Sequence, residues 1–136
     1  MSENPGVAAP GFRHDIGRVQ DRYFYMRRRH WKGETPYLIG DVYLDPRILA
    51  QVPRELLLNT STLKILLQIP RLEVARAEQT LVIGTADTEM ARLLNVSINA
   101  PTAVVHRTFV GGDGDIIAIT GGTYRGDSIR LDMTLR

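Results

Sequence analysis

The sequence contains no cysteine, only three histidines, and no hydrophobic run near the length of a membrane-spanning helix. Without cysteine, disulfides, thiolate nucleophiles and cysteine-ligated zinc or iron–sulfur sites are excluded. Without about 20 consecutive apolar residues, a transmembrane helix is not expected, and we predict no membrane partner. The first residues also lack the basic and then apolar pattern of a secretory signal, so we expect a cytoplasmic protein.

Motifs for catalysis and metal binding are also missing. His14, His30 and His106 form no His-x-His or i, i+4 pair, so their spacing predicts no metal site and no cofactor. No serine lies in a G-x-S-x-G motif. The glycines of 111–114 lie between two predicted strands rather than before a helix, which argues against a P-loop or dinucleotide site. We predict no catalytic residue, although two of the 15 acids could still meet as a pair.

The 136 residues are enough for one domain with one core, and 43% apolar with 24% charged residues is typical of a globular protein. Residues 1–16 are rich in Pro, Gly and Ala without apolar periodicity, so we expect a flexible leader followed by a domain over 17–136. The net charge is only +2, but basic residues gather between Arg13 and Lys32. That cluster could contact an anion, a nucleic acid or only water.

The last third of the chain predicts an antiparallel meander. Residues 103–110 alternate as a strand does, Asp113-Gly114 favours a type I′ hairpin turn, and residues 115–122 return as a β-branched strand. After the YRGD turn at 124–127, the apolar residues of 129–135 all face one way. This alternation predicts a third strand.

The first half predicts a second hairpin and the centre of the sheet. Residues 22–31 alternate, and the KGET turn leads into another alternating run at 36–44. One side of the first strand carries Tyr23, Tyr25, Arg27, Arg29 and Trp31, and the other carries Arg22, Phe24, Met26, Arg28 and His30. Residues 71–86 become β-branched toward their end, and we expect them to form a central strand.

Short helices are expected between these strands. Pro46 and Pro53 each suit a first helical turn, and residues 59–62 offer several hydroxyl or amide N-caps for a helix that closes at Pro70. Asp87 is the expected N-cap of a further helix. The sum is an α+β fold, an antiparallel sheet of about six strands flanked by short helices.

Several segments together resemble one family. They are MRRRHWKGETP, DVYLDP, STLKILL, AEQTLVIGTADTEMARLLNV, APTAVVHRTF and TGGTYRGD, in order over residues 20–136. The chain resembles the UTRA domain, the effector-sensing half of HutC-type regulators in the GntR family. The resemblance implies a chorismate lyase-like fold, a small-molecule effector, a homodimer and no catalysis. It also implies that DNA is contacted only through a winged helix-turn-helix domain, which this sequence does not include.

The resemblance also points to binding residues. The family's Arg-x-Arg falls on Arg27 and Arg29, whose guanidiniums share a face and could bind a carboxylate or phosphate. Its helix-opening hydroxyl falls on Thr62, with Ser61 adjacent, and its closing tyrosine on Tyr124. From these residues we expect an anionic effector, bound where the arginines meet the amino end of the helix.

This chain departs from the family pattern at several positions. The KGET turn is one residue longer, so the family's second-strand acid corresponds to Gly40 or, after a slip, to Asp41. Acids common before YRGD are replaced by Ala118 and Gly121, which disfavours an amino-sugar phosphate. Two alternatives stay open: a lyase or isomerase on the same fold with Asp41 as base, and a dimerisation module without a ligand.

Overall fold

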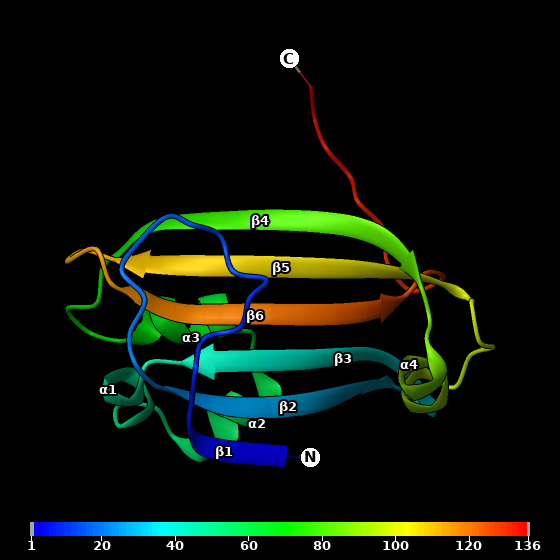
Figure 1. Cartoon of the computed structure of the whole chain (residues 1–136), viewed down its shortest axis with the longest axis horizontal. Helices are drawn as coiled ribbons and strands as arrows, with labels where there is room; N and C mark the ends of the chain where they lie inside the picture. Colours follow the sequence, from blue (N-terminus) through cyan, green and yellow to red (C-terminus); the bar gives the residue numbers. More distant parts are fainter. Residues whose placement is uncertain (1, 136) are drawn as a thin grey trace.

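The structure, a computed structural model, describes residues 2–135. Its strands form one six-stranded antiparallel sheet in the order β1-β2-β3-β6-β5-β4 (Figure 1). The strands are β1 (Ser2–Val7), β2 (Tyr23–Lys32), β3 (Thr35–Leu44), β4 (Val74–Thr85), β5 (Pro101–Gly111) and β6 (Ile116–Arg125). The helices are α1 (Pro46–Leu49), α2 (Arg54–Asn59), α3 (Thr62–Gln68) and α4 (Thr88–Leu94). The predicted α+β class with an antiparallel sheet and short helices is confirmed. Within residues 2–135, no helix approaches the length and apolarity needed to cross a bilayer.

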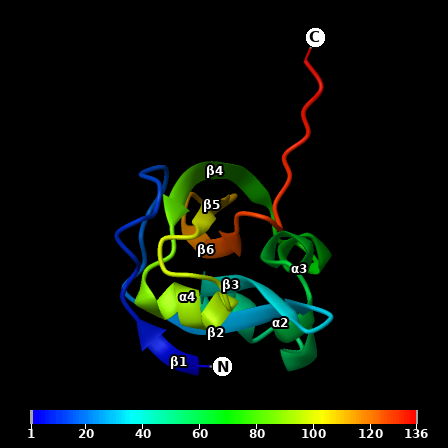
Figure 2. The same cartoon turned by 90° about the vertical axis from the view of Figure 1, so that its right-hand side faces the viewer.

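One face of the sheet is covered by α1, α2 and α3, and we call it the helical face. Figure 2 shows α2 and α3 on this face. Its core combines strand side chains with helix side chains: Phe24, Met26, Val42, Leu44, Phe109, Ile48, Leu57, Ile65 and Leu66. Each such buried side chain contributes about 1.5–3 kcal/mol. Because Phe24 and Met26 point into this core, the strand alternation directs Arg28 and His30 to the same face.

The opposite face is covered by the N-terminal segment and α4, and we call it the N-terminal face (Figure 2). Phe12 and Ile16 pack on a buried cluster that includes Tyr23 and Ile119. At the other end of the sheet, α4 places Leu93 and Leu94 on Ile39 of β3. Asp87 caps α4, as predicted, by accepting a hydrogen bond from the Met90 N–H at 2.8 Å.

The N-terminal segment differs from the flexible leader predicted for residues 1–16. Ser2–Val7 form β1, which pairs with β2, and an ion pair between Glu3 and Arg54 ties this strand to α2. Further on, the Phe12 ring stacks on His106 with centroids 4.2 Å apart. An edge strand is held by backbone hydrogen bonds and needs no apolar pattern, which is why the polar sequence concealed it.

Three strand predictions also need correction. The residue 71–86 run forms β4 at the edge of the sheet rather than at its centre, because no strand pairs with its outer side within residues 2–135. Residues 129–135 keep their alternation but form no strand, since no neighbouring strand receives them. The β5–β6 turn is not type I′: Gly114 has a φ of +89°, but Asp113 is not in the positive region.

Candidate functional site

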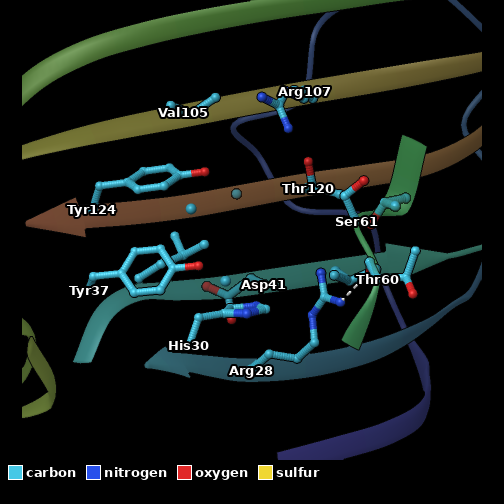
Figure 3. A pocket seen from close by; sticks show the side chains of 16 residues that line it. Arg28, His30, Tyr37, Asp41, Thr60, Ser61, Val105, Arg107, Thr120 and Tyr124 are labelled. Atoms are coloured by element: carbon cyan, nitrogen blue, oxygen red, sulfur yellow. Dashed lines mark hydrogen bonds between the residues drawn. The ribbon is translucent and has the colours of Figure 1, made fainter. Parts of the chain in front are cut away.

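A cavity of about 290 Å³ opens on the helical face, between the sheet and the junction of α2 and α3 (Figure 3). Four strands and this junction contribute polar and charged residues to the lining of the cavity. They are Arg28, His30, Tyr37, Asp41, Thr60, Ser61, Thr62, Arg107, Thr120 and Tyr124. In Figure 3 the rings of Tyr37 and Tyr124 lie at one end, with their hydroxyls directed inward, while Arg28 and Thr60 lie at the other. The cavity is therefore polar at both ends.

Arg28 is the central cation of the cavity. Its Nη1 donates to the carbonyl oxygens of Leu57 at 2.6 Å and Thr60 at 3.0 Å, which fixes the guanidinium beneath the α2–α3 junction. Its Nε is buried, and no hydrogen-bond partner for it lies in the part of the chain that the structure describes. Burial lowers the pKa of Arg28, because the charged form loses solvation. No carboxylate within bonding distance compensates this charge among residues 2–135.

Further groups surround that cation. Burial and the nearby charge of Arg28 lower the pKa of His30, which favours a neutral imidazole that can donate or accept a hydrogen bond. Arg107 lies on the far wall, and its Nε donates to Gln79 of β4 at 2.6 Å. Gly40 and Gly122 leave the floor of the cavity without side chains, because a Cβ on either would point toward lining residues, His30 for Gly40 and Leu38 and Tyr124 for Gly122. A Cβ on Gly122 would lie 3.0 Å from the Leu38 side chain.

Arg27 and Arg29 do not lie in this cavity, which corrects the predicted arrangement. Arg27 sits on the N-terminal face, where Nε and Nη2 form a two-pronged contact with Asp41 at 2.8 and 3.1 Å. Its Nη1 binds Glu89 of α4 at 2.9 Å. These hydrogen bonds raise the pKa of Arg27. Arg29 stacks on Trp31, with its guanidinium carbon 4.6 Å from the ring centroid.

Asp41 borders the cavity, but its carboxylate is engaged from the N-terminal face. Besides Arg27, it accepts a 2.5 Å hydrogen bond from the Tyr25 hydroxyl. Burial and this bond raise the pKa of Tyr25 to about 12, so the phenol stays protonated and donates. Both carboxylate oxygens therefore have strong donors that hold them away from the cavity.

Of the predicted binding residues, the structure brings Asp41, Ser61, Thr62 and Tyr124 to the same cavity. The Ser61 Oγ caps α3 by accepting from the Lys64 N–H at 3.4 Å. The sequence reasoning missed Arg28 and His30. The signal was available, since both residues lie on the same side of β2 as Phe24 and Met26, the apolar side chains that face the helices.

A metal centre has no evident ligand set in this cavity. Within residues 2–135, no group of three or more His, Asp or Glu side chains could hold a metal ion together. The chemistry available is thus hydrogen bonding from hydroxyls and imidazole together with electrostatic attraction from two guanidiniums.

Comparisons with known proteins agree with this architecture. The UTRA domain model matches residues 18–130. No curated protein matches the sequence. A GntR-family regulator of Enterococcus faecalis V583 superposes with a TM-score of 0.78 at 12% identity, covering 98% of this chain and 96% of its own.

Two further solved structures show the same fold. The ligand-binding domain of a putative GntR-family regulator from Bordetella bronchiseptica has a TM-score of 0.72 at 19% identity, covering 100% of this chain and 86% of its own. The C-terminal domain of the histidine utilization repressor from Pseudomonas syringae pv. tomato str. DC3000 has a TM-score of 0.73 at 16% identity. It covers 96% of this chain and 92% of its own. The resemblance seen in the sequence is therefore confirmed.

Proposed function

Because the chain belongs to the UTRA domain family, the sensing domains of GntR-type transcription regulators, we propose that its cavity binds a small anionic effector. The observation that carries this proposal is Arg28, a guanidinium held in the cavity whose buried Nε–H has no partner among the described residues. A buried donor without a partner costs about 1–3 kcal/mol, more for a charged group. A carboxylate or phosphate bound there would satisfy the donor and neutralise the charge.

The rest of the lining limits the shape of this effector. A volume of about 290 Å³ lies just below the usual range for small-molecule sites, about 300–1,000 Å³. The acid group would lie against Arg28 and the hydroxyls of Thr60 and Ser61. Tyr37 and Tyr124 would hydrogen-bond polar groups at the other end. A compact metabolite with an acid at one end and hydroxyl or amino groups at the other fits these requirements.

We infer that the domain senses its ligand without converting it. Among residues 2–135, the only carboxylate bordering the cavity is that of Asp41, and Arg27 and Tyr25 hold it from the opposite face. A general base must reach the proton that it removes, and a carboxylate with both oxygens engaged elsewhere does not. This geometry argues against the lyase or isomerase alternative.

In this proposal the domain acts on DNA through a winged helix-turn-helix domain that this sequence does not include, and it works in the cytoplasm as a homodimer. The effector would favour one dimer arrangement by binding it more tightly, and the difference in affinity sets the size of the shift. The support for this part is the family relationship.

The test is a binding screen with inorganic phosphate, metabolite carboxylates and phosphate monoesters, read first by thermal shift and then by calorimetry. Tyr37→Phe and Tyr124→Phe each remove one cavity hydroxyl, and we expect about 2- to 10-fold weaker binding, the value of one neutral hydrogen bond. Tyr43→Phe is the matched control, because Tyr43 packs beside Phe12 on the N-terminal face. If no anion raises the melting temperature, the ligand-free dimerisation module becomes the better account.

A further inference from the structure

Among the three histidines of the chain, only His30 lines the cavity. The ring of His14 is hydrogen-bonded to Thr108 at 2.8 Å, and the ring of His106 stacks on Phe12. Both of these contacts lie on the N-terminal face, because Thr108 and His106 alternate together along β5. One imidazole therefore lies beside the candidate ligand site, and two lie on the opposite side of the sheet.

The ring of His30 lies over a glycine of the neighbouring strand. Its Nε2 is 4.0 Å from the position that a Cβ on Gly40 would take, and Gly40 pairs with Arg28 across β2 and β3. In Figure 3 the imidazole lies between the Tyr37 ring and the Arg28 guanidinium. An anion bound to Arg28 would then lie beside the imidazole.

The surroundings of this imidazole carry positive charge. The titratable or charged residues that line the cavity with it are Arg28 of β2, Tyr37 and Asp41 of β3, Arg107 of β5 and Tyr124 of β6. The α2–α3 junction adds only hydroxyl-bearing residues to this set. Because Asp41 is engaged by Arg27 and Tyr25 from the opposite face, the net charge of the lining comes from its two guanidiniums.

These surroundings keep His30 neutral but leave it available to a ligand. Burial and the charge of Arg28 lower the pKa of the imidazole. Within residues 2–135, the ring contacts Tyr37 with centroids 6.3 Å apart but has no hydrogen bond or ion pair. Both ring nitrogens are therefore free to bond a ligand, as acceptor and donor when neutral and as two donors when protonated.

We propose that His30 takes up a proton from solvent when an anion binds in the cavity, so that the imidazolium becomes a third cation against the ligand. The anion offsets the repulsion from the guanidiniums, and the new N–H donates a charge-assisted hydrogen bond to it. By linkage, the protonated protein binds the anion more tightly by the same factor that the anion strengthens proton binding. The domain then responds to effector concentration and to acidity together.

This inference rests on the anion site of the proposed function and adds a protonation step to it. It also favours effectors that keep two negative charges, since the imidazolium brings a third positive group to the site. Sulfate is a suitable probe, because it keeps two negative charges between pH 5 and pH 8, whereas phosphate monoesters titrate within this range.

The first test follows the three imidazoles of the unaltered chain by proton NMR between pH 5 and pH 8, with and without saturating sulfate. We expect the pKa of His30 to rise by about 1 on binding, because an opposite charge at close range favours the imidazolium. The pKa values of His14 and His106 should change by less than about 0.2, since the sheet separates them from the cavity. If sulfate binds and the pKa of His30 does not rise, the inference is overturned.

The second test measures affinity against pH by calorimetry at constant ionic strength. A rise of about 1 in the pKa predicts about fivefold tighter sulfate binding at pH 5.5 than at pH 7.5. It also predicts uptake of about half a proton per sulfate near pH 6, measured in buffers with different heats of ionisation. His30→Gln keeps a polar side chain without titration, and its affinity should stay within about 1.5-fold over this range. His106→Gln is the matched control on the opposite face, and it should retain the fivefold change.

The outcomes separate this inference from the proposed function. The tightest carboxylate from the screen is measured in the same way as sulfate. Binding whose affinity does not depend on pH leaves the anion site standing and overturns the role of His30. A pH dependence that persists in His30→Gln does the same. If no anion binds at any pH, both the proposed function and this inference are wrong.

Discussion

Arg28 and Arg27 are neighbours on β2, but replacing them should affect different properties. Replacing Arg28 should weaken ligand binding, and replacing Arg27 should lower stability. Arg28→Met removes the cavity cation, and a hydrogen bond to a charged group contributes about 1.5–3 kcal/mol. Since 1.4 kcal/mol is tenfold in affinity, we expect binding of an anionic ligand to weaken about 10- to 150-fold. Stability should change little, because the lost bonds to Leu57 and Thr60 are offset by relief of the burial of charge.

Arg27→Met is the matched control, with the same substitution one residue away on the other face. It leaves the Asp41 carboxylate, whose side chain is 22% exposed, without its two-pronged partner. Removing one member of a largely buried pair costs about 3–5 kcal/mol, and partial exposure reduces this to about 2–4 kcal/mol. Affinity should stay within about twofold, since Arg27 does not line the cavity.

Both variants can be measured by the same two assays. Calorimetry with inorganic phosphate, and with the tightest ligand from the screen, gives the affinity. Urea unfolding gives the free energy of unfolding. The reasoning is refuted if Arg27→Met weakens binding as much as Arg28→Met does, or if Arg28→Met leaves binding intact.

Three other predictions concern stability. Asp45→Ala removes the buried N-cap carboxylate of α1 and should lower the free energy of unfolding by about 1–2 kcal/mol, seen in urea titrations at pH 7. Burial lowers the pKa of His30 and of His106, so the unfolded chain binds protons more readily than the folded chain. The free energy of unfolding should therefore be highest above pH 6.5 and fall below it. Replacing both histidines by Asn should weaken this pH dependence, measured as the melting temperature at a series of pH values. Gly121→Val should displace the Phe12 ring, because a Cβ at this position would lie 3.0 Å from the ring, and it should raise hydrogen exchange in the N-terminal segment while β2 stays protected.

The strands and their hairpins were predictable, but the orientation of β2 was only partly so. Period-2 alternation says that Arg27 and Arg29 share a face, and that Arg28 and His30 share the other. Which face points inward depends on neighbours, and here the apolar residues Phe24 and Met26 decide it. The family motif of spaced arginines points to Arg27 and Arg29, the pair that does not line the cavity. The bulge between His30 and Trp31 adds a register shift that spacing alone does not show.

The edge elements were the least predictable part of the fold. β1 is polar and is held by backbone pairing, so its sequence looks like a linker. β4 is apolar enough to resemble a central strand, yet it stands at the edge. Residues 129–135 have the pattern of a strand, but a strand also needs a partner. In each case side-chain pattern reports the surface that a segment presents, whereas its place in the sheet is set by contacts distant in sequence.

The alternation along β2 has a consequence for how such a domain can diverge. On one face, Arg27 forms an ion pair with Asp41 and Arg29 stacks on Trp31. On the other face, Arg28 and His30 line the cavity. Alternate residues of the same strand thus have two separate roles, structural contacts on one face and cavity lining on the other. If the cavity binds the proposed effector, changes at positions 28 and 30 would alter ligand preference while the contacts of Arg27 and Arg29 on the other face stay in place.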